Sequence, residues 1–204
     1  MDLHLRPDRD NFPLATLPKP VYAAGFLDSH RRCMAPSGLR FRQGKAGEVT
    51  PMLIRSLHPD DRQSWERLYR GYAGFYRVET SDDKLATLFD WLMDPAHPCN
   101  GLVAEDEGEA LIALAHYREM PSPLRGENVG FLDDLFVDPA ARGRRAGEAM
   151  LRHLDGIAGE QGWAVVRWIT RDNNYRARGL YDRLAHRSDW ITYEMTGDST
   201  GRLT

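Results

Sequence analysis

The stretch VDPAARGRRAGEAMLRHL, residues 137–154, joins a segment typical of a strand to a segment typical of a helix. Between the two lies a turn that holds three arginines and two glycines. After the turn, apolar residues recur every three or four positions and so fall on one helical face: Ala146, Met150, Leu151, Leu154, Ile157 and Ala158. The turn therefore lies directly at the N-terminus of a predicted amphipathic helix.

This turn has the composition of an anion-binding site. A helix N-terminus presents backbone N–H groups without intrahelical partners, together with the positive end of the helix dipole. Gly143 and Gly147 allow a ligand to approach the backbone, while Arg142, Arg144 and Arg145 surround the same point with cationic donors. The combination predicts a phosphate cradle, and a basic surface turn with a glycine cap is the alternative. The glycine patterns of a Walker loop and of a dinucleotide fold are both missing from this turn.

Length and composition indicate one globular domain. The chain has 204 residues, of which 42% are hydrophobic and five are tryptophan, enough for a full core. No stretch approaches the roughly 20 apolar residues of a membrane span, and the N-terminus lacks the pattern of a secretory signal. We therefore expect a cytoplasmic protein that does not bind membranes. Cys33 and Cys99 match no metal-ligand spacing, so we expect neither a disulfide nor a metal site.

Charge is divided unevenly along the chain, whose formal net charge is −3. Residues 1–50 hold eight Lys/Arg against five Asp/Glu, so the remainder is acidic. An acidic body argues against direct binding of nucleic acid and suits a cationic partner. Residues 1–50 are also rich in Pro and Gly and show no sustained periodicity. We interpret them as an N-terminal extension or arm, and residues 51–204 as the folded domain.

From Met52 onward, strand and helix patterns alternate, which predicts an α/β fold of the mixed α+β kind. The predicted strands cover residues 52–57, 101–105, 110–120, 129–137, 163–170 and 189–195, and the predicted helices cover residues 58–76, 82–94, 146–158 and 171–185. The first helix carries an aromatic stripe, most of which we expect in the core: Trp65, Leu68, Tyr69, Tyr72, Phe75 and Tyr76.

Two signatures in this order resemble the GNAT superfamily of acetyl-CoA-dependent N-acetyltransferases. They are V-x-P-x-x-R-G-x-x-x-G at residues 137–147 and N-x-x-A-x-x-L-Y at residues 174–181, and a strand separates them. Within the superfamily, the chain is similar to the subgroup that includes histone/polyamine acetyltransferases. The resemblance implies a central, mostly antiparallel sheet with a splayed parallel strand pair, flanked by about four helices. It also implies direct acetyl transfer in a ternary complex, and a homodimer.

The resemblance assigns binding roles to residues of this sequence. Backbone groups of Leu135, Phe136 and Val137 would pair with the pantetheine arm of acetyl-CoA. Asn174 and Ala177 of the second signature would contact the same cofactor. The pyrophosphate would lie on the N–H groups of the turn, which are those of Arg142, Gly143, Arg144, Arg145, Ala146 and Gly147. One departure is that Arg145 stands where the superfamily has its first loop glycine.

Acetyl transfer to an amine needs a proton acceptor and a proton donor. An alkylammonium with a pKa of ~10.4 must lose a proton first, which costs roughly 4 to 5 kcal/mol at neutral pH. Asp133 and Asp134 are the candidate bases, with Asp134 favoured, and strand alternation places them on opposite faces. Either aspartate could instead only attract a cation. Tyr181 is the candidate acid that protonates the departing thiolate.

The acceptor amine is not specified by the sequence. In this superfamily the first helices wall the acceptor pocket, so we expect at least one of Tyr69, Tyr72 and Tyr76 to line it. A small amine, a polyamine, an amino acid and a peptide lysine all fit as acceptors. The alternative function is a non-catalytic sensor or scaffold that binds acyl-CoA.

Overall fold

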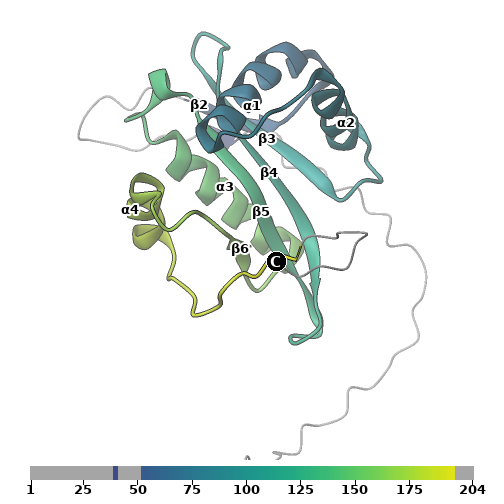
Figure 1. Ribbon diagram of the computed structural model, residues 1–204, viewed down its shortest axis with the longest axis vertical. Helices are drawn as coiled ribbons and strands as arrows, with labels where there is room; N and C mark the ends of the chain where they lie inside the picture. The colour runs from purple at the N-terminus through teal and green to yellow at the C-terminus, as the bar shows by residue number, and fades with distance from the viewer. Residues whose placement is uncertain (1–38, 41–51, 196–204) are drawn as a thin grey trace, which may run out of the picture. The chain divides into compact units, whose positions relative to one another are not determined.

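The computed structural model describes residues 39–40 and 52–195. In this part of the chain a sheet of order β1-β2-β3-β4-β5-β6 carries helices on both faces (Figure 1). The strands are β1 (Leu39–Arg40), β2 (Met52–Ser56), β3 (Cys99–Asp106), β4 (Leu111–Ser122), β5 (Glu127–Val137) and β6 (Val166–Trp168). The helices are α1 (Arg62–Tyr76), α2 (Asp82–Met93), α3 (Ala146–Gln161) and α4 (Tyr175–Leu184). Neighbouring strands are antiparallel except for the parallel pair β5 and β6. The predicted fold class is confirmed.

Each face of the sheet has its own apolar core. The cluster under α1 and α2 consists of Leu57, Trp65, Leu68, Leu85, Phe89, Val103, Leu111, Leu114 and Phe136. The cluster under α3 includes Leu102, Ala113, Ala115, Leu132, Met150, Leu154, Ile157 and Trp163, and Leu180 and Tyr181 of α4 pack against it. From Ala113 to Ala115, successive β4 side chains alternate between the two clusters, as a strand buried on both faces requires.

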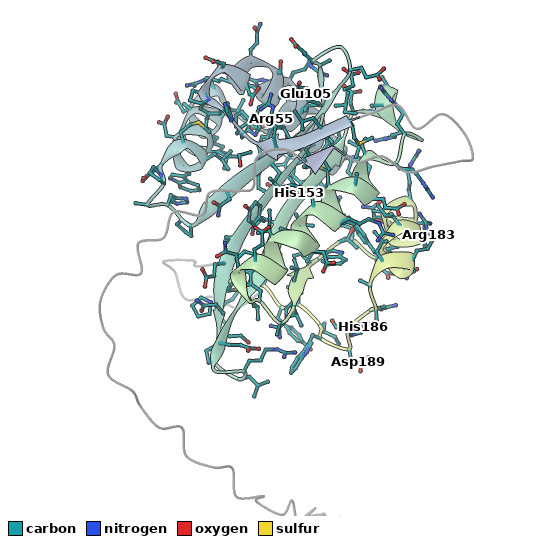
Figure 2. All side chains as sticks on the ribbon, turned by 180° about the vertical axis from the view of Figure 1, so that it is seen from behind. Arg55, Glu105, His153, Arg183, His186 and Asp189 are labelled. Carbon is teal, nitrogen blue, oxygen red and sulfur yellow. The ribbon has the colours of Figure 1, made fainter. Side chains whose placement is uncertain are left out.

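The predicted helix boundaries follow local capping signals. The Ser81 side chain accepts a hydrogen bond from the Lys84 N–H and caps α2, as expected. The start of α1 is held by Arg55, whose guanidinium donates to Asp61 at 2.6 and 2.9 Å and to Glu105 at 2.8 Å. Figure 2 shows Arg55 and Glu105 lying together on β2 and β3. This partly buried ion-pair network ties the N-terminus of α1 to two strands.

The structure differs from the sequence-based prediction at both ends of the sheet. No strand forms at residues 189–195, and Trp190 and Tyr193 are 77% and 88% exposed. That prediction was wrong because alternation favours a strand only where another strand supplies hydrogen bonds. β6 is also shorter than predicted. At the other end, β1 pairs with β2 through Leu39 and Ile54, although no element was expected before Met52.

A β-bulge in β5 sets which side chains face α1. The register with β4 shifts between His116 and Tyr117, so that Tyr117 lies opposite Leu132 and His116 opposite Asp134. Asp133 is therefore the extra residue. In an unbulged strand Leu132 and Asp134 would share a face. Here Leu132 packs under α3, whereas Asp134 contacts His116 on the α1 side.

Candidate active site

The paired strands β5 and β6 separate after a short contact. Their parallel register consists of three residue pairs and ends where Leu132 lies opposite Trp168, while β5 continues to Val137. The β5 backbone from residue 133 to 137 therefore has β4 on one edge and no described ladder on the other. The three residues predicted to hold the pantetheine arm, Leu135, Phe136 and Val137, lie in this segment.

The turn after β5 is anchored before it reaches α3. Asp138 accepts hydrogen bonds from the Ala140 N–H at 2.9 Å and from Arg67 of α1 at 2.6 Å. The first of these bonds, together with Arg67, lowers the pKa of the Asp138 carboxyl. The path of the chain between β5 and the arginines is thus fixed by a local hydrogen bond within the turn and by an ion pair with α1.

The N-terminus of α3 presents backbone N–H groups that lie outside its helical hydrogen-bond ladder. The first backbone hydrogen bond of α3 runs from the Ala149 N–H to the Arg145 carbonyl. The N–H groups of Ala146, Gly147 and Glu148 therefore precede the helical ladder. The Arg145 side chain makes no capping hydrogen bond to them. A Cβ on Gly147 would lie 3.3 Å from Leu180, so this glycine lets α4 pack closely against the end of α3.

The three arginines of the turn have different partners. Arg144 donates to Asp106, the last residue of β3, at 3.4 Å. Arg145 lies 3.7 Å from Glu148, one turn into α3, and its side chain is 61% exposed. Arg142 is exposed and close enough to Asp138 to help lower the pKa of that carboxyl. Cationic groups therefore surround the helix end.

Arg145 adopts the left-handed conformation, with φ of 62° and ψ of 17°. This explains why related loops use glycine here, since the conformation costs other residues roughly 1 to 2 kcal/mol. Arg145→Gly and Arg145→Ala remove the same charge, but only the glycine relieves the strain. We expect the glycine variant to be more stable than the alanine variant by about 1 kcal/mol in urea unfolding. Equal stabilities of the two variants would contradict this account.

The second signature forms the start of α4. Asn174 is the N-cap: its side chain accepts from the Ala177 N–H at 3.5 Å and donates to the Thr170 hydroxyl at 3.1 Å. The structure thus gives Asn174 and Ala177 a capping contact, and their predicted contact with the cofactor stays a prediction. Tyr181 lies edge-on to Trp168 of β6, with ring centroids 5.4 Å apart. Burial, and then the nearby Tyr76, raise the pKa of Tyr181 to about 12.

The adjacent aspartates have different surroundings. Asp133 is exposed and accepts from the Arg118 guanidinium at 3.0 and 3.2 Å. Asp134 is half-buried, and one of its oxygens lies 2.8 Å from Nδ1 of His116. Burial, and then the nearby Asp134 carboxylate, raise the pKa of the Tyr72 hydroxyl. A cation thus neutralises Asp133, while Asp134 points beneath α1 among aromatic side chains.

A cavity of about 560 Å³ opens between α1 and α2. Its walls are mostly aromatic or apolar, and its charged side chains are two acids and one base. The lining residues are Tyr69, Tyr72, Ala73, Tyr76, Val78, Glu79, Thr80, Asp83, Lys84, Thr87, Leu88 and Trp91. All three tyrosines that the sequence predicts for the acceptor site line this cavity. Because Tyr72 also lies close to Asp134, the cavity wall reaches the sheet near the candidate base.

Several partly buried groups near the site have raised pKa values, which predicts loss of stability at alkaline pH. Burial raises the pKa of Tyr69 and of Tyr181 from 10.0 to about 12, and the pKa of Cys99 from 9.0 to about 11. The unfolded chain therefore releases these protons first. Since the folded state then binds more protons than the unfolded state, the free energy of unfolding falls as pH rises from about 9 to 12. Denaturant titrations across this range measure the slope.

Matched phenylalanine variants test this assignment. Tyr69→Phe removes one of the buried phenols, and we expect a shallower fall of the free energy of unfolding between pH 10 and 12. Tyr193→Phe removes a phenol that is 88% exposed and serves as the control. An identical pH slope for both variants would contradict the role of burial at Tyr69.

Sequence reasoning missed some residues of the site. His116 lies 1% exposed in an otherwise apolar strand run, and a lone histidine in such a run was the available signal. Arg171 donates to the Tyr76 carbonyl at 3.2 Å, and its guanidinium lies 4.9 Å from the centre of the Tyr76 ring. No sequence pattern marked Arg171, because this contact joins the β6–α4 segment to the far end of α1.

The comparison with known families decides the classification. The model of the Acetyltransferase (GNAT) family matches residues 65–186, more than half of the chain. The chain belongs to the GNAT acetyltransferase family. The resemblance inferred from the two signatures is confirmed.

Relatives of this GNAT acetyltransferase carry the names of N-acetyltransferases. It is 29% identical over 148 residues to a D-amino-acid N-acetyltransferase of Saccharomyces cerevisiae, covering 72% of this chain and 91% of the yeast protein. It is 30% identical over 138 residues to an uncharacterized N-acetyltransferase of Bacillus subtilis, covering 68% and 91% of the two chains. A thialysine N-epsilon-acetyltransferase of Sus scrofa is 23% identical over 171 residues, covering 76% and 98%. The family and these relatives identify the chain as an N-acetyltransferase.

Solved structures show the same fold. A ribosomal-protein-alanine N-acetyltransferase from Brucella melitensis matches with a TM-score of 0.61 and 23% identity, covering 71% of this GNAT acetyltransferase and 98% of that chain. A probable acetyltransferase matches with a TM-score of 0.64 and 19% identity, covering 72% and 98%. Within the described residues no helix is long and apolar enough to cross a membrane. The same residues contain no group of three or more His, Cys, Asp or Glu side chains placed to hold a metal ion.

Proposed function

We propose that this enzyme transfers an acetyl group from acetyl-CoA to a primary amine on a cationic acceptor. The observation that carries the proposal is the position of Asp134. Its carboxylate lies on the β5 segment that has separated from β6 and close to Tyr72, which lines the cavity between α1 and α2. An amine in that cavity would therefore meet a carboxylate beside the gap in the sheet.

The chain's own groups fit acetyl-CoA. Acetyl-CoA, when bound, supplies the acetyl thioester. The phosphates suit the three N–H groups at the start of α3, with Arg142 and Arg145 exposed beside them. The amide-bearing arm suits the unpaired backbone edge of Leu135 and Val137, which can donate and accept hydrogen bonds as a strand does.

Asp134 and Tyr181 then serve the two proton transfers of the reaction, one as acceptor and the other as donor. The Asp134 carboxylate accepts a proton from the acceptor ammonium, directly or through water, and so offsets part of the ~4 to 5 kcal/mol cost of deprotonation at neutral pH. The Tyr181 hydroxyl donates a proton to the departing sulfur. Its raised pKa, about 12, keeps the phenol protonated throughout the physiological range.

Direct transfer agrees with the state of Cys99. Burial, followed by the charges of Asp133 and Asp134, raises the pKa of the Cys99 thiol to about 11. Since the thiolate is the nucleophilic form, a thiol that stays protonated is a poor carrier of an acyl group. The proposal therefore needs no covalent enzyme intermediate at this cysteine.

The cavity favours a cationic acceptor. The aromatic faces available to an ammonium group in the cavity are those of Tyr69, Tyr72 and Tyr76. The acidic side chains of Glu79 and Asp83 also line the cavity. Named relatives act on D-amino acids and on thialysine, by their names, so both kinds of amine belong in a test panel.

A binding and turnover experiment tests the function. Calorimetry with CoA and with pantetheine compares ligands that differ in the phosphate-bearing half, and we expect much tighter binding of CoA, weakening as salt rises. Thiol release from acetyl-CoA is then measured with a diamine, a D- and an L-amino acid, a lysine peptide and an aminoglycoside. Binding of CoA without amine-dependent thiol release favours the sensor alternative. Equal affinity for CoA and pantetheine contradicts the phosphate cradle.

Charge changes at the cavity wall predict changes in KM. Glu79→Gln and Asp83→Asn each remove a negative charge, and we expect KM for the best cationic acceptor to rise by roughly 2- to 5-fold with little change in kcat. Lys84→Gln removes the positive charge of the same wall and should lower KM. A KM that moves in the same direction for Lys84→Gln and Asp83→Asn would contradict electrostatic selection.

A further inference from the structure

Two buried side chains, Trp65 and His116, form a hydrogen-bonded chain that ends at the half-buried Asp134. The Trp65 indole Nε1–H donates to Nε2 of His116 at 2.9 Å. Nδ1 of the same imidazole lies 2.8 Å from an Asp134 carboxylate oxygen. Trp65 and His116 are each 1% exposed. The three residues come from α1, β4 and β5, so the chain crosses from a helix through one strand to the next.

The direction of this chain follows from the indole. An indole N–H can only donate a hydrogen bond, so Nε2 of His116 must accept and cannot carry a proton. A neutral imidazole bears one proton, which is then on Nδ1 and is donated to Asp134. Protonating Nε2 as well would set two N–H groups against each other at 2.9 Å. Trp65 thus selects both the tautomer and the neutral form of His116.

The imidazole has little freedom to turn. The Tyr69 ring stacks on Trp65 with centroids 5.5 Å apart and also contacts the His116 ring at 5.5 Å. The Phe89 ring of α2 also packs against the Trp65 ring, with centroids 5.1 Å apart. The register shift between His116 and Tyr117 brings Asp134 directly opposite the imidazole. Contacts from α1, together with the bulge in β5, therefore hold the His116 ring in one orientation.

We propose that His116 is a positioning residue for Asp134, held as the neutral Nδ1–H tautomer by Trp65. A neutral donor orients a carboxylate without cancelling its charge. The neighbouring Asp133 shows the contrast, because the Arg118 guanidinium neutralises it. With one Asp134 oxygen held by His116, the carboxylate retains further lone pairs for the acceptor amine. The catalytic consequence rests on the proposed function, whereas the tautomer does not.

Nitrogen-15 NMR of histidine-labelled protein at pH 7 reads the tautomer without any activity. We expect the wild-type His116 ring to show a proton on Nδ1 alone. Trp65→Phe removes the indole donor, and we expect signals from forms protonated at Nε2 to appear. Trp163→Phe replaces a buried tryptophan of the core under α3 and should leave the His116 signals unchanged. A wild-type ring protonated at Nε2 overturns the proposal.

Rates with the best acceptor then separate positioning from packing. His116→Leu fills the ring volume without a donor, and we expect kcat/KM to fall roughly 10- to 100-fold, as for a misplaced catalytic group. His116→Asn keeps an N–H near the Nδ1 position and should recover part of the rate at a similar melting temperature. Equal rates for the Asn and Leu variants overturn the positioning role. If the wild type transfers no acetyl group to any amine, the proposed function fails, and the NMR result still decides the tautomer.

Discussion

Replacing Tyr181 with phenylalanine is expected to lower kcat by roughly 10²- to 10⁴-fold, the usual loss for a general acid. Phenylalanine keeps the ring that packs edge-on against Trp168, so the fold and the affinity for CoA should survive. Only the proton donor is lost. Because the pKa of Tyr181 is raised to about 12, its phenol stays protonated at pH 7 and at pH 9. The ratio of wild-type to variant kcat should therefore be the same at both pH values.

Tyr175→Phe is the matched control for this experiment. Tyr175 lies on the same helix, α4, but is 74% exposed, so loss of its hydroxyl should leave kcat within about 3-fold of the wild type. A Tyr181→Phe enzyme with the kcat of the Tyr175→Phe enzyme at both pH values would reduce Tyr181 to a packing residue.

Asp134→Asn is the second substitution that we expect to lower activity strongly. The amide matches the carboxylate in size but carries no charge and is a poor proton acceptor, so we expect kcat/KM for the amine to fall by roughly 10²- to 10⁴-fold. Raising the pH from 7 to 9 increases the fraction of free amine about 100-fold when its pKa is ~10.4. The deficit of the variant should therefore shrink over this range.

Asp133→Asn separates the two neighbouring carboxylates. Asp133 is exposed and paired with Arg118, away from the cavity, so its amide variant should keep kcat/KM within about 3-fold. CoA affinity should be unchanged in both variants. A larger loss at Asp133 than at Asp134 would reverse the assignment of the base.

Local signals in the sequence predicted the fold and much of the candidate site. Apolar residues at helical spacing marked α3, and a serine marked the start of α2. The glycines and arginines of the turn before α3 predicted an anion-binding role, which stays a prediction. Each of these signals lies within a few residues of what it determines. The positions of Leu135 to Val137 followed from the same turn, because strand and turn are continuous.

Features that depend on distant partners were not predicted. The pattern at residues 189–195 is that of a strand, yet pairing decides whether one forms, and pairing involves residues far away in sequence. His116 was not recognised because its partners Trp65 and Asp134 lie 51 and 18 residues away. The bulge was also invisible, since strand alternation assumes an unbroken register. Its presence is what separates Leu132 and Asp134 onto different faces.

The bulged residue Asp133 follows directly after Leu132, the last β5 residue paired with β6. A bulge bends its strand and increases the local twist, so β5 turns away from its neighbour at the point where the gap begins. The gap is then set by the number of residues in β5 rather than by the chemistry of any one of them. Substitutions at Asp133 leave that number unchanged. We expect that removing the residue would keep Asp134 on the α1 side but straighten the strand, so that the β6 ladder could continue across the edge that the cofactor arm would use. In this acetyltransferase, we therefore expect the sheet to open because β5 has one extra residue, whatever the side chain of that residue.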